Sequence, residues 1–214
     1  MKKVVILGAG GNSKVVVDVI KKGNGQNKEE LELIGFLDDD PEKKECCDLP
    51  VLGRTDQIGA LCKQENIFFV NGIGNNVVRK YFYHTYPDVQ WISVIHPSAV
   101  IAEDVIIEDG AMIMPGAIIN PGSKIGKLAL INTGVIVEHD NEIGAFAHVA
   151  SGVVTAGNVY VGECAMLGTG SRVIQGIKIG ANSVIGAGAC VISDIPEGVT
   201  AVGVPARVVK HHGD

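Results

Sequence analysis

The chain has 214 residues, of which 46% are hydrophobic, so it is long enough to bury one large core or two smaller ones. Its net charge of -6 argues against the basic stripe typical of nucleic-acid-binding proteins, and small molecules are therefore the expected partners. No apolar run approaches the roughly 20 residues of a membrane span. We therefore expect a cytoplasmic protein without a membrane span.

The cysteines indicate a reducing compartment. They are five in number and show no metal-type spacing: Cys46, Cys47, Cys62, Cys164 and Cys190. An odd count without such spacing is not typical of a disulfide framework or of a zinc site. We therefore expect no bound metal.

Strand and helix patterns alternate over residues 1–90. Strands are predicted at 3–8, 31–40 and 68–76, and helices at 14–22, 57–65 and 77–86. This alternation predicts a truncated Rossmann-like α/β domain with a parallel sheet. Its ligand site should lie beyond the carboxyl ends of the strands.

Two loops of this domain have residues suited to a nucleotide. In "GAGGNS", Gly8 and Gly10 fit the dinucleotide fingerprint, whereas Ser13 stands where the third glycine would be. Backbone N–H groups at the start of the following helix can hold a phosphate, and a plain tight turn is the alternative. In "GFLDDD", Asp38 and Asp39 suit ribose hydroxyls or base N–H groups, with a solvated loop as the alternative.

The second half of the chain is a six-residue repeat. Cut from Val94 onward, it gives seventeen hexads whose second residue is Ile, Val or Leu in all but one case, Thr155. This period is typical of a parallel β-helix in which three hexads complete one coil. We expect a β-helix over residues 91–198, a little under six coils tall. Residues 199–214 are expected to form a tail, with His211 and His212 frayed.

One corner of the repeat concentrates polar residues. The hexad register directs Val137 inward and places His139 and Asp140 on a corner, where the two side chains can pair. Asn141 and Thr155 both depart from the repeat nearby, and such departures are expected at functional or strained sites. A solvated charged corner is the alternative.

Six motifs together resemble one family, the nucleotide-amino-sugar acetyltransferases related to the sialic-acid O-acetyltransferases and often called PglD-like or NeuD-like. The motifs are "VVILGAGG", "GFLDDD", "GIGNNVVRK", "IHPSAVI", "IVEHDNEIGAFAHVASG" and "AVGVPARVV". The resemblance implies a homotrimer of left-handed β-helices, with acetyl-CoA between adjacent helices and a nucleotide in the N-terminal domain. It implies acetyl transfer to the 4-amino group of a nucleotide-linked 4-amino-4,6-dideoxy sugar. We favour UDP as the nucleotide of this sugar.

The resemblance also implies roles for individual residues. His139 would be the general base, and Asp140 would orient its imidazole. Acetyl-CoA would be contacted by His148, Thr169 and Ala187, the last standing where family members often have glycine. The nucleotide sugar would be contacted by Gly10, Gly11, Asn12, Asp38, Asp39 and Gly74, with Asn12 in place of the common histidine.

The spacing of two histidines bears on the assembly. His139 and His148 are nine residues apart, which is half of an eighteen-residue coil. At about 3.3 Å per strand residue, they should lie on different sides of one prism and more than about 10 Å apart. A site that uses both must therefore be shared between subunits.

Three other functions fit parts of the sequence. The first is an O-acetyltransferase acting on a sialic-acid-like or other sugar acceptor. The second is a γ-type carbonic anhydrase, which needs three imidazoles on one zinc; it is disfavoured because His96 lies more than two coils below His139. The third is a non-enzymatic scaffold or nucleotide-sugar sensor.

Overall fold

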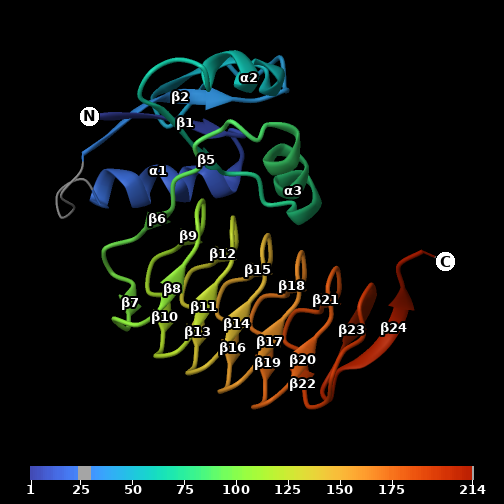
Figure 1. Ribbon diagram of the computed structural model, residues 1–214. Coiled ribbons are helices and arrows are strands. Elements are labelled where there is room, and N and C mark those ends of the chain that lie inside the picture. The colour runs from blue at the N-terminus through green and yellow to red at the C-terminus, as the bar shows by residue number, and fades with distance from the viewer. Residues whose placement is uncertain (24–29, 214) are drawn as a thin grey trace. The chain divides into compact units, whose positions relative to one another are not determined.

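The computed structural model describes residues 1–23 and 30–213. It divides into two compact units, Met1–Pro97 and Ser98–Asp214, each with its own architecture (Figure 1). No helix among the described residues has the length and apolar character needed to cross a membrane.

The first unit is an α/β domain built on one sheet. Its elements are β1 (Lys2–Leu7), α1 (Gly11–Gly23), β2 (Leu31–Leu37), β3 (Glu45–Cys46), β4 (Leu49–Gly53), η1 (Thr55–Gln57), α2 (Ile58–Leu61), β5 (Ile67–Asn71), α3 (Asn76–Thr85) and β6 (Val94–Ile95). The sheet order is β3-β4-β2-β1-β5, with β4, β2, β1 and β5 mutually parallel. The predicted Rossmann-like α/β class with a parallel sheet is confirmed.

The apolar sequence of β1 fits its central position in the sheet. All four residues of its 4–7 segment are fully buried, as expected for a parallel strand with neighbours on both sides. Helix α1 buries Val16, Val19 and Ile20, which are spaced to lie on one helical face.

The strands β3 and β4 were not predicted, because segment 45–53 is short and mixed in polarity. The turn between them uses Cys47 and Asp48, both with positive φ.

The second unit is a parallel β-helix of two-residue strands. With β6, seventeen such strands run to β22, one at the start of every predicted hexad. They are β7 (Val100–Ile101), β8 (Ile106–Ile107), β9 (Met112–Ile113), β10 (Ile118–Ile119), β11 (Lys124–Ile125), β12 (Leu130–Ile131), β13 (Ile136–Val137), β14 (Glu142–Ile143), β15 (His148–Val149), β16 (Val154–Thr155), β17 (Tyr160–Val161), β18 (Met166–Leu167), β19 (Arg172–Val173), β20 (Lys178–Ile179), β21 (Val184–Ile185) and β22 (Cys190–Val191).

Each strand of the β-helix pairs with the strand eighteen residues away, as in the register Ile119↔Val137 and Val137↔Thr155. The pairing produces three sheets. The first sheet contains β7, β10, β13, β16, β19 and β22, the second β8, β11, β14, β17 and β20, and the third β6, β9, β12, β15, β18, β21, β23 and β24. Stacked three-sided coils are visible in Figure 1.

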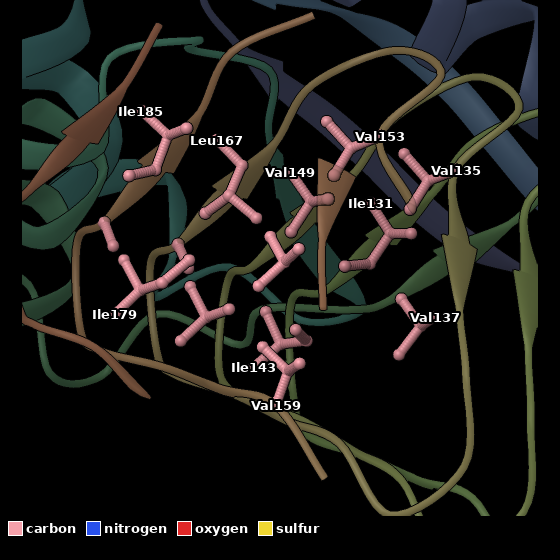
Figure 2. Packing of buried hydrophobic residues seen from close by; sticks show 14 of the residues in the cluster. Ile131, Val135, Val137, Ile143, Val149, Val153, Val159, Leu167, Ile179 and Ile185 are labelled. Atoms are coloured by element: carbon pink, nitrogen blue, oxygen red, sulfur yellow. The ribbon is translucent and has the colours of Figure 1, made fainter. Parts of the chain in front are cut away.

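The core of the β-helix is a stack of aliphatic residues from the second hexad positions, joined by alanine, valine and isoleucine residues from the sixth positions. Figure 2 shows their side chains pointing into the coil interior, among them Ile131, Val149 and Leu167. All three are fully buried. Thr155 occupies the same kind of position and is also fully buried, so the one exception in the repeat is an interior residue.

A backbone conformation that L-residues rarely adopt recurs at the corners, which are the bends between consecutive strands. From residue 110 to residue 188, every sixth residue has a positive φ. Eight of these positions are glycine, namely Gly110, Gly116, Gly122, Gly134, Gly152, Gly170, Gly176 and Gly188, and six are Leu128, Asp140, Phe146, Asn158, Cys164 and Asn182. Asn and Asp are the non-glycine residues that tolerate this region best.

The C-terminal end of the β-helix is ordered. Strand β23 (Val199–Val202) pairs with β21, and β24 (Arg207–His211) returns antiparallel to β23. The His212 ring bonds through Nε2 to Thr200 Oγ1 at 2.8 Å and through Nδ1 to the Asn182 carbonyl at 3.1 Å. The expectation that His211 and His212 are frayed is therefore wrong, because this hairpin closes the last coil.

Replacing Ile131 by Ala should lower the free energy of unfolding of the β-helix by about 2 to 5 kcal/mol, because it leaves a cavity in a fully buried stack. Ile106→Ala is the matched control, since Ile106 is 59% exposed, and it should change stability by less than about 0.5 kcal/mol. Urea unfolding of both variants measures the difference. Equal effects would contradict the assignment of the second hexad position to the interior.

Candidate active site

A histidine–carboxylate pair lies on the corner between β13 and β14. His139 Nδ1 lies 2.8 Å from Asp140 Oδ2, and both side chains are 58% exposed. Because an ionised carboxylate only accepts hydrogen bonds, Nδ1 is the donor. In the neutral imidazole the lone pair is then on Nε2, which can take a proton from a bound molecule.

The backbone of this corner fixes where Asp140 projects. Asp140 has φ +57°, and its N–H donates to the Pro121 carbonyl of the coil below at 2.9 Å. A Cβ on Gly122 would lie 2.5 Å from Asp140 Oδ1, so the carboxylate occupies the space that a side chain there would fill. Glycine at position 122 is thus required for this carboxylate position.

A second glycine, in the coil above, makes room for the imidazole. A Cβ on Gly157 would lie 2.5 Å from His139 Cε1 and 2.6 Å from Nε2. The ring therefore lies directly against the backbone of Gly157. The pair is thus framed by two glycines, one below the carboxylate and one beside the imidazole.

The second histidine, His148, lies on β15 beside an asparagine that sequence reasoning missed. Thr133 N–H donates to Asn132 Oδ1 at 2.8 Å, which turns the amide nitrogen of Asn132 toward His148 Nε2 at 3.3 Å. Because an amide nitrogen only donates, Nε2 accepts and the proton of a neutral His148 is on Nδ1. In the sequence, the only sign of this contact is that Asn132 of "INTG" precedes His148 by sixteen residues.

One chain does not bring the two histidines together. His139 lies on the corner between the first and second sheets, whereas His148 lies on a strand of the third sheet. They therefore lie on different parts of the coil perimeter, as their nine-residue spacing requires.

Thr169 and Ala187 lie on the corner that joins the third sheet to the first. They are stacked in successive coils, and Gly188 N–H donates to the Thr169 carbonyl at 2.9 Å. The positive-φ residue of this corner is glycine in five successive coils: Gly116, Gly134, Gly152, Gly170 and Gly188. A Cβ on any of these glycines would meet nothing within 4 Å, so this corner offers bare backbone to a ligand.

In the first unit, three loops meet at the carboxyl ends of β1, β2 and β5. The Ala9 N–H donates to Asp38 Oδ2 at 2.6 Å, and Asn12 Nδ2 donates to the Gly72 carbonyl at 3.1 Å. A Cβ on Gly10, Gly11 or Gly74 would meet nothing within 4 Å. The predicted glycines therefore lie in loops with open space beside them, at the edge where a parallel sheet binds ligands.

The two predicted aspartates of this edge have different partners. Burial raises the pKa of Asp38, but hydrogen bonds from the Ala9 and Asp40 N–H groups and from Lys43 outweigh it, so the pKa lies below its ordinary value. Asp38 is therefore ionised at neutral pH. Asp39 instead accepts from Thr55, at 3.0 Å from the N–H and 2.8 Å from the hydroxyl.

A buried arginine, also missed by sequence reasoning, supports the loop that contains Gly74. The Arg79 side chain is fully buried, and its guanidinium donates to the Ile73 and Gly74 carbonyls at 3.1 and 2.9 Å and to Asn76 Oδ1 at 3.0 Å. The contact could not be foreseen, because Arg79 reaches back along its own chain from a helix that reads as amphipathic.

Metal-ligating side chains do not cluster in the described part of the chain. Over residues 1–23 and 30–213, no group of three or more His, Cys, Asp or Glu side chains is placed to hold a metal ion. His96, His139 and His148 in particular do not form such a group there. None of the five cysteines, which all lie in the described part of the chain, forms a disulfide bond.

Comparison with known proteins shows similarity over almost the whole chain. Residues 3–86 match the PglD N-terminal domain family. A histidine-to-asparagine variant of perosamine N-acetyltransferase from Caulobacter crescentus, solved with CoA and GDP-perosamine, is 37% identical, with 98% of each chain covered and a TM-score of 0.90. No curated protein matches the chain significantly.

Two further structures extend this similarity. The acetyltransferase domain of PglB from Neisseria gonorrhoeae, solved with acetyl coenzyme A, is 31% identical over 97% of this chain and 99% of that one, with a TM-score of 0.88. WeeI from Acinetobacter baumannii is 29% identical over 98% of this chain and 100% of that one, with a TM-score of 0.86.

Gly157→Ala should displace the His139 imidazole by about 1 Å, because a contact of 2.5 Å must relax to ordinary van der Waals distance. The ring is the exposed end of a side chain, so stability should change by less than about 0.5 kcal/mol. A crystal structure of the variant measures the shift, with Gly59→Ala as control, since a Cβ there meets Tyr86 at an ordinary 3.4 Å. An unmoved ring would contradict the described contact.

Proposed function

Since the chain belongs to the PglD-like family of sugar N-acetyltransferases with a hexapeptide-repeat, left-handed β-helix fold, we propose that it transfers the acetyl group of acetyl-CoA to the amino group of a nucleotide-linked sugar. The observation that carries the proposal is the exposed His139–Asp140 pair, which presents a basic imidazole nitrogen on the β-helix surface. The acceptor proposed in finer detail is the 4-amino group of a 4-amino-4,6-dideoxy sugar.

The chemistry assigned to the pair is general base catalysis. The neutral sugar amine attacks the thioester carbonyl carbon, the bond from that carbon to sulfur breaks, and the amine proton passes to His139 Nε2. The proton then becomes available to the departing CoA sulfur, so the reaction balances without an acetyl-enzyme. Asp140 keeps the proton-accepting nitrogen outward and stabilises the imidazolium that forms. In two histidine variants of the Caulobacter enzyme, CoA and GDP-perosamine are both bound, so that histidine is not needed for binding either ligand.

Acetyl-CoA is assigned to the corner that contains Thr169 and Ala187, with His148 near the thioester. The uninterrupted glycines of that corner support this assignment, since they allow a ligand to approach the backbone closely. A neutral His148 whose Nδ1 has the proton is suited to donate to a carbonyl oxygen. Ala187 precedes the corner glycine, so a contact there would run through its backbone.

The nucleotide is assigned to the carboxyl edge of the sheet in the first unit. Gly10, Gly11 and Gly74 would admit the phosphates close to the backbone at the start of α1. Asn12, Asp38 and Asp39 would contribute polar contacts. That the nucleotide is UDP stays a prediction. The GDP-perosamine complexes of the Caulobacter enzyme make GDP the other nucleotide to test.

A homotrimer is proposed because one chain does not unite the two histidines. The outward positions of the first sheet are apolar in four successive coils: Val100, Ile118, Ile136 and Val154. Val100 is 63% exposed and the other three are partly exposed. An apolar stripe of this kind supports packing against a second copy, which would bring His148 of one subunit near His139 of another. A cytoplasmic location also stays a prediction.

We expect release of free CoA to depend on a nucleotide-linked amino sugar, and His139→Ala to lower kcat by about 10²- to 10⁴-fold. The assay uses acetyl-CoA with UDP-, GDP- and dTDP-linked 4-amino-4,6-dideoxy sugars. The nucleotide whose sugar gives the highest turnover identifies the nucleotide that the protein prefers. His84→Ala is a matched control, because His84 lies on α3 and has no assigned role in binding or proton transfer, and it should keep the wild-type rate.

Two outcomes would contradict this proposal. Turnover with hydroxyl acceptors only would instead indicate the O-acetyltransferase. Equal turnover by wild type and His139→Ala would remove His139 as the base.

Gly11→Ala should raise the KM for the nucleotide sugar by about tenfold or more while leaving the KM for acetyl-CoA unchanged, because a methyl group at the proposed phosphate approach overpacks the site. The position is the first residue of α1, has ordinary φ and faces open space, so the thermal midpoint should stay the same or rise. Kinetics and calorimetry measure the two effects. An unchanged sugar KM would exclude close approach of the ligand at this glycine.

A further inference from the structure

Asn141, the residue after the His139–Asp140 pair, is buried in the wall of the β-helix. Its exposed fraction is 1%, and it stands where the repeat usually has a small or aliphatic residue. The corresponding positions one coil below and one coil above are Ser123 and Val159. An amide is therefore inserted at one level of an otherwise small or apolar column.

The amide nitrogen of Asn141 connects the active corner to the coil above. It donates to the carbonyl of Glu138, to that of His139 at 3.3 Å and to that of Ala156 at 2.9 Å. The first two carbonyls belong to the segment that leads into the imidazole. The third belongs to the peptide directly before Gly157, against which the imidazole lies. One side chain thus sets the spacing between the histidine and its glycine support.

The coil below contributes to the same network. Ser123 Oγ donates to the Glu138 carbonyl at 2.9 Å and accepts the Asn141 N–H at 3.2 Å. The backbone on both sides of the pair is therefore held by buried side-chain hydrogen bonds as well as by the strand ladder. Such buried networks make the geometry they hold more rigid.

This arrangement has a cost in stability. Asn141 Oδ1 and Thr155 Oγ1 are buried and have no hydrogen-bond partner among the described residues. Unpaired buried polar atoms destabilise a fold, and an aliphatic residue at either position would avoid the loss. A residue that is unfavourable for the fold but in contact with the active corner is expected to serve the site.

We propose that Asn141 is a positioning residue for acetyl transfer, which holds His139 and Asp140 in their paired geometry through the Glu138, His139 and Ala156 carbonyls. The proposal rests on the function proposed above. Asn141 acts through the pair and does not itself touch the substrate.

The kinetic test is Asn141→Leu, which keeps nearly the same shape and removes the amide donor. We expect kcat to fall about 10- to 100-fold, as for residues that orient a reacting group, with both KM values within about threefold of wild type. The urea midpoint should change little, because the variant removes one unpaired buried oxygen and also the amide hydrogen bonds to the three carbonyls, and these two effects oppose each other. In the His139→Ala background the same substitution should cause no further loss of kcat.

The control is Ser183→Ala. Ser183 is also fully buried in the β-helix and donates one hydrogen bond to a backbone carbonyl, that of Gly180 at 2.6 Å, but it lies away from the pair. It should keep the wild-type kcat. If Asn141→Leu does not fold, Asn141→Ser replaces it in the same cycle, since serine occupies the equivalent position one coil below.

A crystal structure of the variant gives a readout that does not depend on activity. We expect the distance from His139 Nδ1 to Asp140 Oδ2 to exceed 3.5 Å, or the ring to leave Gly157. A retained 2.8 Å bond with an unmoved ring would overturn the proposal. So would an equal loss of kcat with and without His139. If wild type transfers acetyl to no acceptor, the proposed function fails, and the crystal structure alone decides whether Asn141 positions the pair.

Discussion

The β-helix depends on a bend that recurs every six residues. A three-sided coil closes only if the backbone turns at each corner, and here every sixth residue from 110 to 188 turns with a positive φ. Glycine adopts this conformation at the least steric cost, and each non-glycine corner adds strain that the stacked aliphatic interior must offset. The aliphatic anchors can stack because the corners keep successive coils in register at eighteen residues.

The same constraint decides where chemistry can be placed. Asp140 occupies a positive-φ corner that aspartate tolerates, so the backbone fixes the direction in which its short side chain projects. Glycines in the coils below and above leave room for the carboxylate and for the imidazole of His139. On another corner the positive-φ residue is always glycine, which leaves the backbone bare. One repeat thus produces both a reactive corner and an accessible one.

Sequence reasoning was strongest where the repeat or the strand–helix alternation determines the structure. Every hexad begins with a strand, and the sheet of the first unit is parallel as predicted. It failed for contacts that no periodicity encodes. Asn132 meets His148 from the neighbouring coil, and Arg79 turns back into the loop before its own helix. The ordered His212 was missed for the same reason, since its partners Thr200 and Asn182 lie 12 and 30 residues away. The β3–β4 hairpin is local and was missed because its segment is short and mixed in polarity.

Stability and function make opposite demands on one level of the β-helix. Val137 and Val173 flank Thr155 in their column, and both are aliphatic, so the fold alone would favour an aliphatic residue there. The polar residues Asn141 and Thr155 are instead found within one coil of His139, where they leave buried oxygen atoms unpaired. The remainder of the aliphatic stack is long enough to offset such a loss. A repeat architecture can therefore hold a destabilising polar cluster at one level, because each coil is stabilised mainly by its immediate neighbours.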